Sequence, residues 1–123
     1  MVATQYNTIT KGKNVASTSS FSPDIVYTVP FNHDAEITFL HISNGGSSNA
    51  NVTIEFDHDD SSTDFFLLDA YQIGGHGSYD VISGGSVFYM HQRDSIKVFK
   101  SAGADIHIIL SGREVYNPNR PQT

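Results

Sequence analysis

From residue 24 to residue 112 the chain alternates short apolar runs with turns rich in Gly, Ser, Asn and Asp. Residues 50–57 are the clearest case, because every even position is apolar and every odd position is polar. A period of two is typical of a β-strand with one buried face and one wet face. No segment shows the period of an amphipathic helix. The pattern therefore predicts an all-β protein.

The same reading predicts about eight strands, at residues 24–29, 36–43, 50–57, 64–68, 78–82, 86–90, 95–100 and 105–110. Glycine-rich turns separate several of them, most clearly at residues 44–49 and 83–85. Many short strands at this spacing are typical of a sandwich or a barrel. We expect an antiparallel β-sandwich, of jelly-roll or immunoglobulin-like type.

One of these strands changes phase. In residues 37–42 the apolar positions switch from odd to even between Phe39 and Leu40. A β-bulge would reset the phase in this way. A strand covered on both faces, with its outer face in an interface, would show the same pattern.

The two ends of the chain have a different composition. Residues 1–22 are polar, with a Ser/Thr run and isolated apolar positions at Tyr6, Ile9 and Val15. Such a segment buries too little apolar surface to offset its ordering entropy alone. We therefore expect an extended N-terminal arm at residues 1–22, a sandwich domain at residues 23–116 and an extended tail at residues 117–123, where two prolines preclude a helix or a central strand.

Composition and charge narrow the function. The chain has 123 residues, a formal charge of −6 and 7 Lys and Arg, which argues against a nucleic-acid binder. The absence of cysteine excludes a disulfide scaffold and a thiolate zinc site. No signal peptide or membrane-spanning run is apparent. We expect no nucleic-acid partner, no membrane association and no cofactor.

The charges are unevenly distributed. Residues 51–92 carry seven Asp and Glu and no Lys or Arg, whereas residues 93–123 are mildly basic. In a protein that contacts copies of itself, such asymmetry helps to select orientation and register. In an isolated domain the same asymmetry contributes solubility alone.

The acidic segment at residues 57–64 is the best metal candidate, with Asp57, Asp59, Asp60 and Asp64 as oxygen ligands for calcium. It lacks the glycine and the closing glutamate of the helix-flanked calcium loop. A solvated hairpin tip is the alternative, and we therefore keep calcium as a weak candidate.

No arrangement of residues suggests catalysis. The six histidines show no metalloprotease spacing, and no serine lies in a nucleophile elbow. We expect the protein not to be an enzyme. A carbohydrate-binding module that uses aromatic side chains and the loop at residues 57–64 is one alternative function.

Two groups of segments carry a resemblance to a known family. The first is residues 24–30, DIVYTVP, followed by the strand at residues 35–43 and the turn Asn44-Gly45-Gly46. The second is residues 93–98, RDSIKV, followed by the turn at residues 101–104 and the strand from residue 106 to residue 115. Together they resemble small β-sandwich structural proteins of tailed-bacteriophage particles. That family often has Gly-Asp-Ser-Ile where this chain has Arg93-Asp94-Ser95-Ile96.

The resemblance covers about 90 residues and implies a virion structural protein without an activity of its own. We favour a head decoration (cement) protein, located in the virion, which binds the major capsid protein and copies of itself. A neck or tail protein of the same fold is the alternative. In this interpretation the arm and tail order along neighbouring subunits, and the expected assembly contacts are Tyr6, Ile9, Val15, Arg113 and Arg120.

Overall fold

The computed structural model describes residues 6–59 and 64–118, which contain nine β-strands. They are β1 (Tyr6–Asn14), β2 (Asp24–Thr28), β3 (His33–Asn44), β4 (Ala50–Asp57), β5 (Asp64–Ile73), β6 (Ser78–Ile82), β7 (Phe88–Met90), β8 (Ser95–Lys100) and β9 (Ile106–Tyr116). This part of the chain holds no helix long and apolar enough to cross a membrane.

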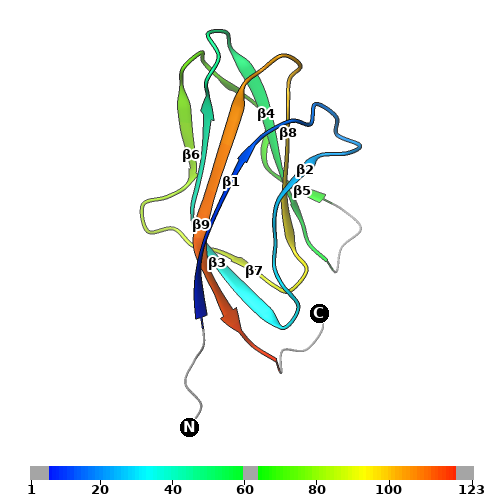
Figure 1. The fold of residues 1–123 in the computed structure, drawn as a ribbon, viewed down its shortest axis with the longest axis vertical. Helices are drawn as coiled ribbons and strands as arrows, with labels where there is room; N and C mark the ends of the chain where they lie inside the picture. Colours follow the sequence, from blue (N-terminus) through cyan, green and yellow to red (C-terminus); the bar gives the residue numbers. More distant parts are fainter. Residues whose placement is uncertain (1–5, 60–63, 119–123) are drawn as a thin grey trace.

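The strands pair in a nested order. β1 pairs with β9, β2 with β8, β3 with β6 and β4 with β5, all antiparallel. The outermost strands in sequence thus pair with each other, as in a long hairpin that has been rolled up. The result is two facing sheets, one in the order β1-β9-β3-β6 with β7 also paired to β3, the other in the order β2-β8-β4-β5 (Figure 1). This is jelly-roll topology.

The all-β antiparallel sandwich predicted from the sequence is confirmed. The predicted bounds of β4, β6 and β8 agree with the structure. β3, β5 and β9 extend further than predicted, and β7 is shorter.

The core lies between the two sheets and consists mainly of β-branched and leucine side chains. Each sheet contributes alternate residues from its two central strands, as a half-buried pleated strand requires. The fully buried members on these strands are Ile37, Leu40, Ile42, Ile106, Ile108 and Leu110 from one sheet and Val52, Ile54, Ile96 and Val98 from the other.

A β-bulge explains the phase change in β3. Ile37 pairs with Gly112, and the next paired residue of β3 is Phe39, opposite Ser111. Thr38 is therefore an extra residue on β3, and the buried positions change from Ile37 to Leu40 and Ile42. The bulge that the sequence left as one of two explanations is present.

The predicted N-terminal arm is wrong for residues 6–14. This segment is the edge strand β1, paired along its whole length with β9. Ile9 and Val15 are buried in the core, at 8% and 1% exposure. A polar strand can form here because β9 supplies its hydrogen-bond partners, so β1 needs little apolar surface of its own.

The loop between β1 and β2 is also fixed to the sandwich. The amides of Ala16 and Ser17 donate to the Asp24 carboxylate at 2.7 and 3.1 Å, and the carbonyl of Ser17 accepts from the amide of Lys100 at 3.0 Å. Burial opposes ionisation of Asp24, but these hydrogen bonds and nearby lysines leave its pKa below the usual value. The loop is therefore part of the domain.

The end of the chain follows the sandwich closely up to the last described residues. The amide of Asn117 donates to the carbonyl of Asn32 at 2.7 Å, just after β9 ends at Tyr116. Residues 119–123 of the predicted tail at residues 117–123, Arg120 included, lie outside the described residues.

If β1 packs as the structure shows, Ile9→Ala should destabilise the isolated protein. Removing most of a buried isoleucine side chain at this edge should lower the free energy of unfolding by about 2 kcal/mol. Urea unfolding followed by circular dichroism measures the change. Thr10→Ala, on the same strand but exposed, is the matched control and should change it by less than about 0.5 kcal/mol. Equal effects of the two substitutions would contradict the packing of β1.

Glycine is required at residue 112, opposite the bulge. A Cβ there would collide with the carbonyl oxygen of Glu36 and would lie 2.9 Å from the Cα of Ile37. Gly112→Ala should therefore lower the free energy of unfolding by about 2 kcal/mol or more. The control is Gly12→Ala on β1, where the nearest atom would be 4.0 Å away. A neutral Gly112→Ala variant in a urea titration would show that the two strands are further apart.

Candidate interaction surface

A groove crosses the outer face of the sheet formed by β1, β9 and β3. We call it the Tyr6–Arg113 groove, and its lining residues are Tyr6, Thr8, Thr10, Thr38, Ser111, Gly112 and Arg113. Its volume is about 370 Å³. Thr38, the extra residue of the bulge, and Gly112, which lies opposite Ile37, both line the groove. The groove therefore lies at the same local irregularity that resets the phase of β3.

Arg113 is held in place at the groove. Its guanidinium contacts the Glu36 carboxylate on β3 at 3.2 Å and lies 5.4 Å from the ring centroid of Tyr6. Thr8, Arg113 and Glu36 are direct neighbours across β1, β9 and β3. Tyr6 is nonetheless 58% exposed, and about half of the Arg113 side chain is exposed as well. Interface centres are enriched in Tyr and Arg because both combine apolar area with polar groups.

The structure describes four of the five predicted assembly residues. It brings Tyr6 and Arg113 together, although they are far apart in the sequence. The prediction that Ile9 and Val15 contact a neighbouring subunit is wrong, because both side chains already fill the core of their own chain. Arg120 lies outside the described residues.

The described carboxylates of the acidic segment make contacts within the sandwich. Asp57 forms an ion pair with Lys97 at 2.7 Å, and this contact raises the pKa of Lys97 although burial opposes it. Asp59 contributes its backbone amide, which donates to Asp94. Asp64 pairs with Asp57 in the strand register, and Asp60 lies outside the described residues. Across the described part of the chain, no three His, Asp or Glu side chains are placed to hold a metal ion.

Asp94 anchors the loops at this end of the sandwich. Its side chain is almost completely buried and accepts from the His58 ring at 2.9 Å, from the amide of Asp59 at 2.9 Å and from the amide of His91 at 2.8 Å. The preceding residue, Arg93, has φ of 69°, a conformation that glycine adopts at lower cost. These residues hold the backbone together, and we assign them a structural role.

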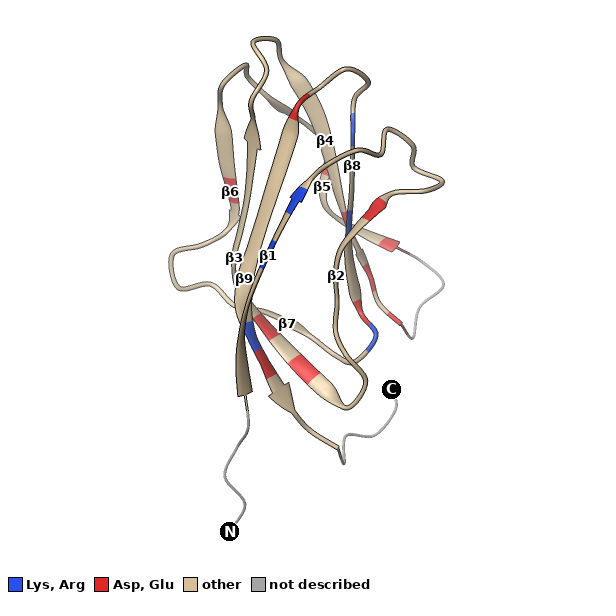
Figure 2. Ribbon diagram, in the orientation of Figure 1, with Lys and Arg blue, Asp and Glu red and all other residues tan. Residues whose placement is uncertain are grey.

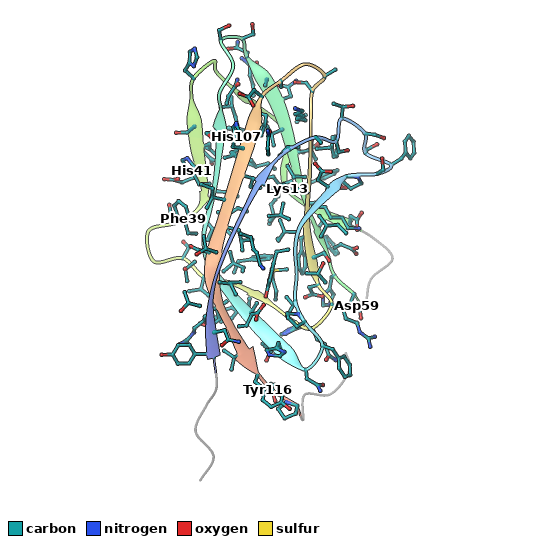
Figure 3. All side chains as sticks on the ribbon, viewed as in Figure 1. Lys13, Phe39, His41, Asp59, His107 and Tyr116 are labelled. Carbon is teal, nitrogen blue, oxygen red and sulfur yellow. The ribbon has the colours of Figure 1, made fainter. Side chains whose placement is uncertain are left out.

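Histidine–aspartate contacts recur elsewhere on the surface. His41 lies 2.6 Å from Asp80 of β6 and stacks on Phe39, with ring centroids 5.7 Å apart (Figure 3). His107, near the end of the sandwich, contacts Asp105 at 3.0 Å. These pairs are partly exposed and separate from one another.

Glu55 is a buried carboxylate on β4. It is 7% exposed, and its Oε1 atom accepts no hydrogen bond from the described residues. Burial raises its pKa, the charges of Asp64 and Asp57 raise it further, and Lys97 opposes them. An ionised carboxylate in this position costs folding free energy, because a buried oxygen that accepts no hydrogen bond has lost its hydration without replacement.

A second hollow, of about 440 Å³, lies between the β3–β4 loop and the β8–β9 loop. Asn44 shapes it by donating to the carbonyls of Ser48 and Ile73 and by accepting from the amide of Gly46. Among the described residues that line this hollow none is aromatic. It therefore offers hydrogen bonds but no ring on which a sugar could stack.

The sequence reading missed most of the groove. Thr8 and Thr10 alternate around the buried Ile9, and this pattern is the one local signal of a strand with an outward hydroxyl face. Thr38, Ser111 and Gly112 enter the groove through pairing between β3 and β9, which no local pattern reveals.

Comparison with known proteins identifies the fold. Neither the protein-family models nor the curated proteins match the sequence. Among solved structures, the chain is similar to a protein of Bacillus endospore appendages, which are described as a family of disulfide-linked pili. The TM-score is 0.50 at 12% identity, over 94% of this chain and 92% of that one. At this identity the similarity concerns the fold alone.

Glu55 gives the free energy of unfolding a specific dependence on pH. Its raised pKa means that the folded chain binds the proton more tightly than the unfolded chain. The cost of the ionised group is therefore present at pH 7 and disappears as the pH falls through the raised pKa toward the ordinary value of 4.5. Glu55→Gln should raise the free energy of unfolding by about 1 kcal/mol at pH 7, and the gain should vanish near pH 4.

Urea titrations of both proteins across this pH range measure the difference. Asp69→Asn, which removes an exposed carboxylate from the neighbouring strand, should have no comparable effect. A Glu55→Gln protein that is less stable at pH 7 would contradict the assignment of an unpaired carboxylate.

Proposed function

We propose that this chain is a non-enzymatic structural protein of a tailed-bacteriophage particle, and that it decorates the head shell. The sandwich would be a rigid body that adds protein–protein contacts to the shell. The proposal rests on the segment resemblance described above and on the presence of a preorganised surface. The jelly-roll fold is compatible with it but does not by itself select a function.

The observation that carries the proposal is the Tyr6–Arg113 groove. The Arg113 guanidinium contacts both the Glu36 carboxylate and the ring of the exposed Tyr6, so less side-chain entropy remains to be lost on binding. Hydroxyl groups from Thr8, Thr10 and Ser111 surround them. This composition suits a protein surface, because the donors and acceptors can match a polypeptide partner while the ring supplies apolar area.

The two segments that resemble the phage proteins form a single structural unit in this chain. β2 pairs with β8, and the amide of Val29 donates to the carbonyl of Asp94 at 2.9 Å. In return, the amide of Arg93 donates to the carbonyl of Val29 at 2.8 Å. Residues 24–30 and 93–98 therefore depend on each other, which supports a resemblance in fold rather than in isolated turns.

The similarity to the endospore appendage protein supports a role in assembly less directly. The appendages to which that protein belongs are described as disulfide-linked pili. The sequence of this chain contains no cysteine, so its copies could not be linked by disulfides. A neck or tail position in the particle would fit the same fold and the same groove.

The test is to purify particles from the phage that carries this chain and to locate the protein by mass spectrometry and cryo-electron microscopy. We expect it on the outside of the head shell, with the Tyr6–Arg113 groove against a capsid subunit. Its absence from purified particles would refute the proposal. Density at the neck or tail would favour the alternative location.

A variant tests the groove itself. Tyr6→Ala combined with Arg113→Ala should leave the unfolding midpoint nearly unchanged, because both side chains are exposed, and should lower occupancy on the particle. Thr28→Ala, at an exposed position of β2 outside the groove, is the control for attachment. Full occupancy of the double variant would show that another surface binds the shell.

A further inference from the structure

The two longest edge strands lie at opposite ends of the sheet orders. β1, of 9 residues, ends the sheet that also contains β9 and β3, and β5, of 10 residues, ends the other sheet. The remaining edge strands of the two sheet orders, β2 and β6, have 5 residues each. A long edge strand presents a row of main-chain donors and acceptors that can pair with another strand.

These two edges carry opposite charges. β1 has Lys11 and Lys13, both exposed, and no Asp or Glu. β5 has Asp64 and Asp69, both exposed, and no Lys or Arg. Figure 2 shows blue on β1 and red at the start of β5. Lys13 also lies near Asp24 of its own chain and lowers the pKa of that carboxyl group.

The acidic edge also exposes apolar surface. Phe65 and Phe66, which follow Asp64 directly, are 52% and 57% exposed. Adjacent exposed aromatic residues on an edge strand are unfavourable in water and mark an interaction site. Beyond Tyr6, β1 carries no aromatic side chain, and Gly12 leaves room next to the backbone. A strand that paired with β5 would cover part of the two rings.

We propose that β1 of one copy of this chain pairs with β5 of a second copy. An antiparallel arrangement sets the lysine-bearing second half of β1 against the first half of β5, which begins at Asp64. It joins the sheet of one copy to the opposite sheet of the next. Because the two paired edges differ, a copy that is bound through its β1 still has a free β5, to which the next copy can bind. Association therefore continues in an open row. This inference uses the edge of β1 rather than the groove on its outer face, and it does not depend on the proposed function.

Charge reversal tests the pairing with purified protein in sedimentation velocity experiments. The wild type should associate in a concentration-dependent way at low ionic strength and dissociate as salt is added, because exposed charges are screened. Lys11→Glu with Lys13→Glu makes both edges acidic, and Asp64→Lys with Asp69→Lys makes both edges basic. Each double variant alone should be a monomer.

Mixing the two double variants should restore association, because every contact between unlike copies then joins an acidic edge to a basic edge. Circular dichroism checks that both variants are folded. If either is not, Lys11→Gln with Lys13→Gln and Asp64→Asn with Asp69→Asn replace them, and each should weaken association. Arg113→Ala should associate like the wild type, which separates this contact from the groove.

A wild type that stays monomeric at millimolar concentration would overturn the inference. So would double variants that associate as well as the wild type, or a mixture that remains monomeric.

Discussion

The backbones of β3 and β9 approach each other so closely at Gly112 that a side chain cannot fit between them. Much of the molecule depends on this contact. It accompanies the bulge at Thr38, and the bulge turns Leu40 and Ile42 toward the core after Ile37. Without the extra residue, a one-residue slip would turn these side chains toward solvent. The Tyr6–Arg113 groove lies beside the same contact, because Thr38 and Gly112 are among its lining residues.

Two buried carboxylates illustrate what burial of a polar group requires. Asp94 is surrounded by donors, and it connects the loop after β4 with the turn before β8. Glu55 has like charges nearby and an oxygen without a donor among the described residues. The first arrangement stabilises a particular loop geometry, whereas the second costs stability. Asp94 therefore contributes to the unique structure, and Glu55 is tolerated because the core supplies enough apolar burial.

Exposed aromatic residues lie both on strands and in loops. Tyr6 is on β1, and Phe65 and Phe66 are on the edge strand β5, whereas Phe21 and Phe31 lie in loops. Asp94 and Asn44, which hold loops at the two ends of the sandwich, form hydrogen bonds with groups of their own chain. A monomer gains little from exposing Tyr6, Phe65 and Phe66.

The sequence by itself determined the fold class and the places of most strands, because alternation along residues 50–57 and 95–100 reports directly on burial of one face. It also indicated the irregularity in β3, since a bulge changes the local phase. It could not reveal β1. That strand buries one residue in nine and is stabilised by hydrogen bonds to β9, about 100 residues later in the chain.

Only the tertiary structure decided that Ile9 and Val15 belong to the core, that Tyr6 and Arg113 meet, and that β1 and β5 are long edges of opposite charge. The reason is the nested pairing order: contacts between the two ends of the chain depend on long-range strand pairing, and local residue patterns carry no information about it.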